Sequence, residues 1–209
     1  MKNNKGWFIV FEGVDGSGKS TQMEKLISRL KMHNQKVFET CEPTPYAIGT
    51  MIRETLQHKS TMAPETLGAL FVADRLEHIL NSEHGMLQHL GQGTHVICSR
   101  YYFSNYAFQS EYVPVDWLVQ ANSLSKKLLK ADFTFYINTD PARCAQRILE
   151  NRNNKELFET EEKIHKAHNA FMSAFENFGS DENIILIDGN RDVESIHTEI
   201  WEIVSKRIS

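Results

Sequence analysis

The chain has 209 residues, 41% of them hydrophobic, which suits one domain, residues 1–209, with a substantial core. Its 23 basic and 27 acidic side chains give a net charge of −4, which argues against a protein dedicated to nucleic acid or a membrane surface. No apolar stretch could cross a bilayer, and three widely spaced cysteines without a C-x-x-C pair favour a reducing compartment, so we expect a cytoplasmic protein.

The first predicted elements are a buried strand over residues 7–12, a glycine-rich turn, and a helix from Lys19 to about residue 34. The turn, residues 13–20, fits the phosphate-binding pattern G-x-x-x-x-G-K-S/T. Its glycines let backbone N–H groups point at an anion, and the start of the helix adds further unpaired N–H groups. Lys19 is predicted to reach the β- and γ-phosphates of ATP, and the Ser20 hydroxyl to ligate Mg²⁺. The predicted ATP-binding residues are Gly13, Val14, Asp15, Gly16, Ser17, Gly18, Lys19, Ser20 and Thr21.

After this loop, strand-like and helix-like patterns alternate along the chain. Further strands are predicted over residues 36–41, 94–98, 132–137 and 184–188. Helices are predicted over 48–56, from 64 into a region ended by 91–93, around 105–109, and over 115–129, 141–149, 159–178 and 193–206. This order indicates a P-loop NTPase fold of the α/β class, in which a five-stranded parallel sheet lies between two helix layers. Ligands of such sheets bind at the carboxyl ends of the strands.

Four further motifs follow the loop in order. They are Glu42-Pro43 with Ile52-Arg53, the run from Phe71 to Arg75, Arg100-Tyr101 with Ser104-Asn105 and Phe108-Gln109, and Asp140-Pro141 ahead of Arg147. With these motifs, the chain resembles the thymidylate kinases over nearly its whole length. The resemblance implies phosphorylation of dTMP by ATP with Mg²⁺, a short lid at about residues 147–158, and a homodimer.

The resemblance also implies roles for individual residues. Phe71 would stack on the thymine, while Arg75, Asn105 and Gln109 would contact its edge. Phe108 would abut the deoxyribose, Arg53 and Arg100 would hold the monophosphate, and Asp15 would face the sugar and the acceptor phosphate. The implied substrate-binding residues are Asp15, Pro43, Arg53, Phe71, Arg75, Arg100, Ser104, Asn105, Phe108 and Gln109. Taken alone, Phe71 would be a core residue and Arg75 a solvated one, but their i, i+4 spacing places both on one helix face.

The phosphate loop contains no arginine, whereas the lid region carries several. Cationic groups there stabilise the charge that spreads over a transferring phosphoryl group. We therefore predict that Arg147 and Arg152 act with Lys19, Arg100 and Asp15 as catalytic residues. The alternative is a solvated basic helix end.

The chain departs from the family pattern in the lid, where Glu156-Leu157-Phe158-Glu159 stands in place of a stretch with an arginine, and at two positions before it. Ser99 replaces the aspartate of an Asp-Arg-Tyr motif, and Cys41 replaces an arginine that many bacterial members have before Glu-Pro. A serine binds a hard cation more weakly than a carboxylate does, and Asp15 or Glu12 could support the water shell of the metal.

Two other functions stay open on the sequence. One is a kinase of a different deoxynucleotide or of a deoxynucleoside, and the other is a non-catalytic nucleotide-binding protein. Arg53 and Arg100 favour a phosphorylated acceptor, because a nucleoside has no phosphate for them to hold. The lid arginines favour catalysis, because nucleotide binding alone needs no stabilisation of a transition state.

Overall fold

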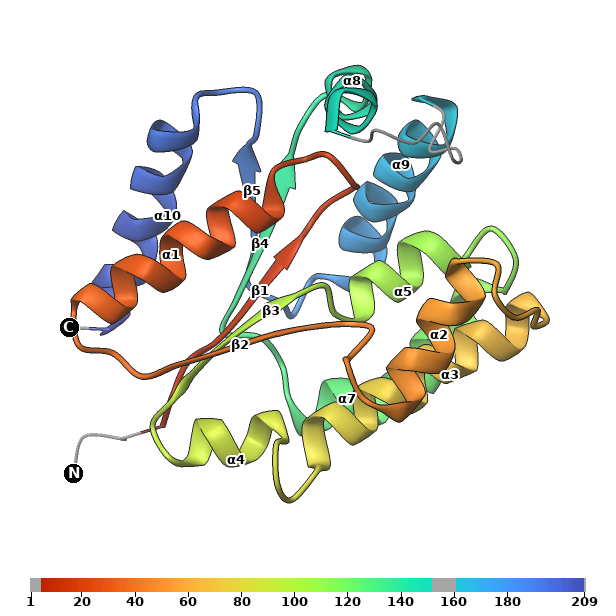
Figure 1. Cartoon of the computed structure of the whole chain (residues 1–209), viewed down its shortest axis with the longest axis horizontal. Helices are drawn as coiled ribbons and strands as arrows, with labels where there is room; N and C mark the ends of the chain where they lie inside the picture. The colour runs from red at the N-terminus through yellow and green to blue at the C-terminus, as the bar shows by residue number, and fades with distance from the viewer. Residues whose placement is uncertain (1–4, 152–160, 209) are drawn as a thin grey trace.

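The computed structural model describes residues 5–151 and 161–208, in which a parallel sheet lies between two helix layers (Figure 1). The strands pair in the order β2-β3-β1-β4-β5, as the parallel register of neighbouring strands shows. This arrangement confirms the predicted α/β fold with five parallel strands. The strands are β1 (Phe8–Glu12), β2 (Val37–Cys41), β3 (His95–Ser99), β4 (Phe133–Asn138) and β5 (Ile184–Asp188).

Helices cover both faces of the sheet. On one face α1 and α10 pack together, and on the other lie α3, α4, α5 and α9 (Figure 1). The helices are α1 (Lys19–Met32), α2 (Ala47–Leu56), α3 (Pro64–Leu80), α4 (Met86–Gly91), α5 (Tyr102–Gln109), α6 (Val115–Ala121), α7 (Ser123–Leu128), α8 (Pro141–Asn151), α9 (Glu161–Phe178) and α10 (Val193–Ile208). In the described ranges no helix is long and apolar enough to span a lipid bilayer.

The position of β1 in the middle of the sheet explains why its sequence is apolar from Phe8 to Phe11 and does not alternate with polar residues. Ile9 and Phe11 of β1 belong to the core formed with α1 and α10, whereas Phe8 and Val10 belong to the core on the opposite face. All four side chains are buried, because both faces of a central parallel strand are covered by helices. This packing fixes the carboxyl end of β1, where the glycine-rich loop begins.

Two regions predicted as continuous helix are each broken in the structure. After α3, the Asn81 side-chain oxygen accepts hydrogen bonds from the backbone N–H groups of Glu83 and His84, and the chain turns before α4 begins. The predicted helix over 115–129 is divided into α6 and α7 at Asn122, a fully buried residue. In both places an asparagine side chain bonds to nearby polar groups, which local periodicity does not reveal.

Candidate active site

The glycine-rich loop joins β1 to α1 and has the backbone that an anion site requires. Gly16 and Gly18 adopt φ angles of 77° and 99°, in the left-handed region that favours glycine. A Cβ at Gly16 would lie 2.5 Å from the carbonyl oxygen of Cys144 in α8, so no larger residue fits there. The loop therefore curls against α8 and leads directly into the N-terminus of α1, where unpaired N–H groups favour a phosphate.

A cavity of about 570 Å³ opens over this loop. Of the nine predicted ATP-binding residues, those from 15 to 21 line the cavity, whereas Gly13 and Val14 do not. Val14 is part of the core, and its carbonyl oxygen accepts a hydrogen bond of 2.8 Å from Lys19 Nζ. The other residues that line it are Gln22, Ser99, Arg100, Ile137, Arg147, Ile148, Gly189, Arg191, Val193 and Ile196.

Among the residues that line the first cavity, one carboxylate, Asp15, and four hydroxyls, those of Ser17, Ser20, Thr21 and Ser99, are oxygen groups that could bind Mg²⁺. Ser20 and Ser99 line the same cavity as Asp15, whose Oδ1 lies 3.9 Å from Lys19 Nζ and 2.5 Å from Arg100. Among the residues that the structure describes, no group of three His, Cys, Asp or Glu side chains could enclose a metal. This sparse donor set fits Mg²⁺, which commonly keeps several waters and takes its other ligands from nucleotide phosphates.

Glu12, at the end of β1, takes no part in that donor set. Its Oε1 accepts hydrogen bonds from the backbone N–H groups of Tyr101 and Ser104, and its Oε2 accepts one of 2.6 Å from Ser104 Oγ. Complete burial raises the pKa of Glu12, although Ser104 and Arg100 act in the opposite direction. The Glu12 carboxylate therefore fixes the start of α5. Of the two side chains expected to support the water shell of a metal, Asp15 and Glu12, only Asp15 lines the first cavity.

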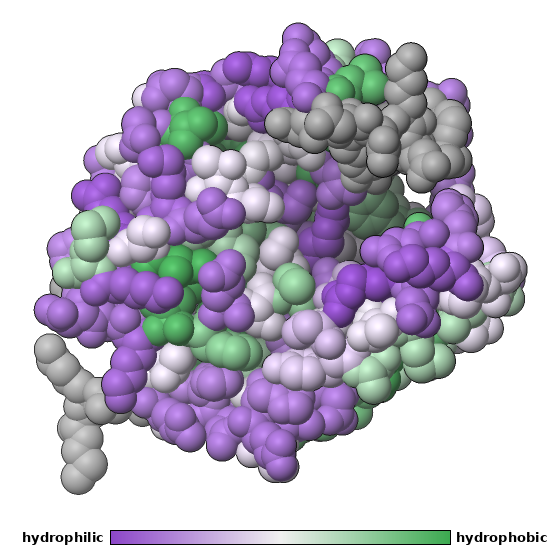
Figure 2. All heavy atoms as spheres, viewed as in Figure 1, coloured by the Kyte–Doolittle hydropathy of each residue, from purple (hydrophilic) through white to green (hydrophobic). Residues whose placement is uncertain are grey.

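A second cavity, of about 230 Å³, lies beside the first and brings together most of the predicted acceptor residues. Figure 2 shows the face that is hollowed between the end of β1 and α2. Nine of the ten predicted residues line the cavity, and Arg53 does not. Its guanidinium instead donates hydrogen bonds to the carbonyl oxygens of Pro43 and Thr44. The lining residues are Asp15, Glu42, Pro43, Leu56, Phe71, Arg75, Arg100, Tyr101, Ser104, Asn105, Phe108 and Gln109.

Asp15 and Arg100 line both cavities, so the two spaces meet at this ion pair. Arg100 has a φ angle of 70°, and its guanidinium carbon lies 4.7 Å from the centre of the Phe108 ring. Its Nη1 also donates a hydrogen bond to Ser104 Oγ. A cation held between a carboxylate and an aromatic face is well placed to meet an anion that enters either cavity.

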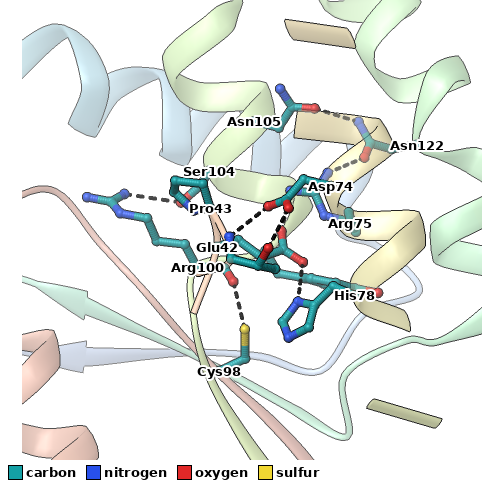
Figure 3. A network of polar contacts seen from close by, with 12 residues as sticks. Glu42, Pro43, Asp74, Arg75, His78, Cys98, Arg100, Ser104, Asn105 and Asn122 are labelled. Carbon is teal, nitrogen blue, oxygen red and sulfur yellow. Dashed lines mark hydrogen bonds and ion pairs between the residues drawn. The ribbon is translucent and has the colours of Figure 1, made fainter. Parts of the chain in front are cut away.

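Arg75 is buried, which contradicts the alternative of a solvated side chain. Its exposed fraction is 1%, and its Nη2 lies 2.6 Å from Glu42 Oε2 (Figure 3). Burial by itself lowers the pKa of Arg75, but the Glu42 carboxylate, together with Tyr101 and Tyr106, acts in the opposite direction, and the net result is a raised pKa. His78 Nδ1 lies 3.1 Å from the other oxygen of Glu42, and its Nε2 lies 2.7 Å from Thr40 Oγ1. The second cavity therefore contains a permanent cation held by a buried carboxylate.

Asn122 is a residue that the sequence motifs missed. Its side-chain oxygen accepts a hydrogen bond from Arg75 Nη1, and its nitrogen donates one of 2.8 Å to Asn105 Oδ1 (Figure 3). Asn105 Nδ2 in turn donates to Gln109 Oε1 at 3.0 Å. The available signal was a polar residue four positions after the buried Leu118, on the core face of a predicted helix.

The predicted lid falls partly outside the described residues, and Arg152 lies in that part. Arg147, on α8, lines the first cavity, and its Nη1 donates hydrogen bonds to the carbonyl oxygens of Gly16 (3.1 Å) and Ser17 (3.4 Å). Arg143, one turn earlier, binds the carbonyl of Asn190 instead. Of these two arginines, only Arg147 lies over the phosphate loop.

Comparison with known proteins agrees with this geometry. The thymidylate kinase family model matches residues 11–200. A protein described as "Probable thymidylate kinase" from Methanococcus aeolicus is 35% identical, with 96% of this chain and 97% of that protein covered. The thymidylate kinase of Plasmodium falciparum is 33% identical, with coverages of 97% and 91%. That of Leptospira borgpetersenii is 31% identical, with coverages of 97% and 95%. The chain belongs to the thymidylate kinase family.

Proposed function

We propose that this protein transfers the γ-phosphoryl group of ATP to dTMP, with the two nucleotides bound in the two cavities. The observation that carries the proposal is the junction of the cavities at Asp15 and Arg100, which line both. A kinase of this kind must hold donor and acceptor phosphates in line and next to each other. One cavity begins at a phosphate loop and the other contains a buried arginine among aromatic and amide side chains, which suits a triphosphate on one side and a base on the other.

On the donor side, the loop N–H groups and Lys19 bind the β- and γ-phosphates, and the Ser20 hydroxyl ligates Mg²⁺. When bound there, the metal would supply positive charge that offsets the charge of the phosphate oxygens. Arg147 releases the carbonyls of Gly16 and Ser17 and turns its guanidinium to the transferring group. Arg152, which lies outside the described residues, is predicted from the sequence to act on the same group. Their contribution lies mainly in the transition state, because the charge on the transferring oxygens develops there.

On the acceptor side, the Phe71 ring stacks on the thymine, and Arg75, Asn105 and Gln109 donate to or accept from its edge. Pro43 and Phe108 bound the space for the base and the deoxyribose. Because Arg53 already bonds the carbonyls of Pro43 and Thr44, it also fixes the turn before α2. Arg100 leaves Asp15 to hold the acceptor phosphate, assisted by Arg53, and Ser104 orients Arg100.

The homodimer, the cytoplasmic location and the action of residues 1–209 as one kinase domain are further proposals, supported by the family resemblance. Sedimentation equilibrium at micromolar concentration measures the first. A mass close to that of a single 24.1 kDa chain would contradict a dimer.

A coupled assay with ATP and a panel of acceptors tests the function. The panel contains dTMP, dUMP, dCMP, dGMP and thymidine at saturating Mg²⁺. We expect dTMP to be preferred and dUMP to follow, with a kcat/KM ratio of about 10–200-fold for the thymine methyl group. The variant Lys19→Ala should lose activity, whereas Lys25→Ala, on an exposed part of the same helix, should retain it. Faster turnover of thymidine, dCMP or dGMP would refute dTMP as the acceptor, and no turnover at all would favour the non-catalytic alternative.

A further inference from the structure

A chain of buried side-chain amides leads from Arg75 along the wall of the second cavity. Arg75 bonds Asn122, Asn122 bonds Asn105, and Asn105 bonds Gln109 (Figure 3 shows the first three residues). Asn122 is 0% exposed and does not line the cavity, whereas the other three do. Asn122 can therefore influence a bound base only through its neighbours.

The direction of this chain is fixed at its beginning. A guanidinium has donors and no acceptor, so the oxygen of Asn122 must face Arg75. The nitrogen of Asn122 then faces both Asn105 Oδ1 and the carbonyl oxygen of Leu118, each at 2.8 Å, and only a donor satisfies these two acceptors. Two independent neighbours thus require the same orientation of the Asn122 amide.

The orientation of the Asn122 amide also determines how the amides of Asn105 and Gln109 are oriented. Since Asn105 Oδ1 accepts from Asn122, its nitrogen must face Gln109, whose Oε1 accepts. The amide nitrogen of Gln109 is left at the end of the chain with no acceptor among the described residues. Arg75 Nε is also buried without a hydrogen-bond partner there. The locked wall therefore offers the N–H donors of the Gln109 amide to a base.

Pyrimidines differ at the position that such a wall would read. Thymine and uracil have an oxygen at C4, which accepts hydrogen bonds, whereas cytosine has an amino group there, which donates them. An amino group placed against N–H donors leaves buried polar groups unpaired on both sides, and sites of this kind discriminate strongly.

We propose that Asn122 is a specificity-determining positioning residue, which locks the amides of Asn105 and Gln109 so that the site accepts a 4-oxo pyrimidine and rejects a 4-amino pyrimidine. The inference rests on the proposed function, because it assigns the base that the second cavity selects. Asn122 makes no contact with the substrate and acts through the two amides that line the cavity.

The variant Asn122→Asp should reverse the direction of the hydrogen bonds along this series of amides. A carboxylate still accepts from Arg75 but cannot donate to Asn105, so the Asn105 amide turns its nitrogen toward position 122 and its oxygen toward Gln109. Gln109 then turns as well and leaves its oxygen at the end of the chain. We expect the ratio of kcat/KM for dTMP over dCMP to fall by about 10-fold or more. The dTMP over dUMP ratio should stay within about twofold, because dUMP has the same 4-oxo group.

Two further variants serve as a second test and as a control. Asn122→Leu removes the lock without reversing it, so its dTMP over dCMP ratio should lie between those of the native protein and Asn122→Asp; it also decides the question if Asn122→Asp does not fold. Ser125→Ala removes a hydroxyl from an equally buried residue that takes no part in the series of hydrogen-bonded amides, so all kcat/KM ratios should stay unchanged. Circular dichroism confirms that each variant is folded.

The outcomes separate this inference from the proposed function. If the native protein does not prefer dTMP, the proposed function fails. If the native protein prefers dTMP but the Asn122 variants keep its dTMP over dCMP ratio, only the role of Asn122 is refuted. Equal changes in the dUMP and dCMP ratios would indicate a loosened pocket, and they would refute the role as well.

Discussion

Replacing Glu42 by glutamine tests whether the ion pair with Arg75 is truly buried. The two side chains are 2% and 1% exposed, and Glu42 also lies 3.1 Å from His78 Nδ1. Glu42→Gln keeps the volume and one acceptor oxygen but removes the negative charge. Arg75 would keep its hydrogen bond to Asn122, yet no carboxylate would balance its charge.

The expected loss follows from the difference between buried and exposed pairs. Removing one partner of a buried pair leaves an uncompensated charge and typically costs about 3–5 kcal/mol in the free energy of unfolding. Because Arg75 keeps two acceptors, the Asn122 oxygen and the oxygen of the new glutamine, we expect a loss of stability near the lower end of this range, at about 3 kcal/mol. In a chain of this size that loss lowers Tm by roughly 6–12 °C.

The matched control is a surface pair with the same separation. Lys25 Nζ lies 2.6 Å from Glu194 Oε1, the same distance as in the buried pair, but these side chains are 33% and 73% exposed. Because solvent screens such a pair, Glu194→Gln should cost about 0–1 kcal/mol. Urea unfolding at pH 7 measures both losses. A loss below about 1 kcal/mol for Glu42→Gln, equal to that of the control, would refute the reasoning.

The remaining predictions concern the reaction. Arg147→Ala should lower kcat on the order of 10²–10³-fold with little change in the affinity for dTMP, because its contacts serve the transition state. The control is Arg143→Ala, one turn away on α8, where the native arginine binds the carbonyl of Asn190, and it should keep full kcat. Full kcat in both variants would show that Arg147 is not a catalytic residue. Ser99→Asp should lower the Mg²⁺ concentration for half-maximal rate at fixed ATP, because a carboxylate binds a hard cation more strongly than a hydroxyl does. The neutral Ser99→Asn should leave that concentration unchanged, and equal behaviour of the two variants would contradict the metal argument.

Local sequence patterns predicted the elements that local physics controls. The uninterrupted apolar run in β1 follows from burial on both faces, and the loop from Gly13 to Ser20 needs its glycines because of backbone angles within the loop itself. The motifs around Phe71, Arg75 and Arg100 also indicated which residues gather around the second cavity, although the i, i+4 spacing showed only that Phe71 and Arg75 share a helix face.

Contacts between distant parts of the chain were decided by the tertiary structure. Arg75 meets Asn122 across 47 positions, and Arg100 meets Asp15 across 85, so no short pattern could contain either pair. The broken helix at Asn122, the burial of Arg75 and the use of Glu12 to hold α5 follow from such contacts. A sequence pattern shows which face of an element is apolar. Whether a polar residue on that face is paired depends on the partner that the fold places against it, because burial is tolerated only where a partner satisfies the polar atoms.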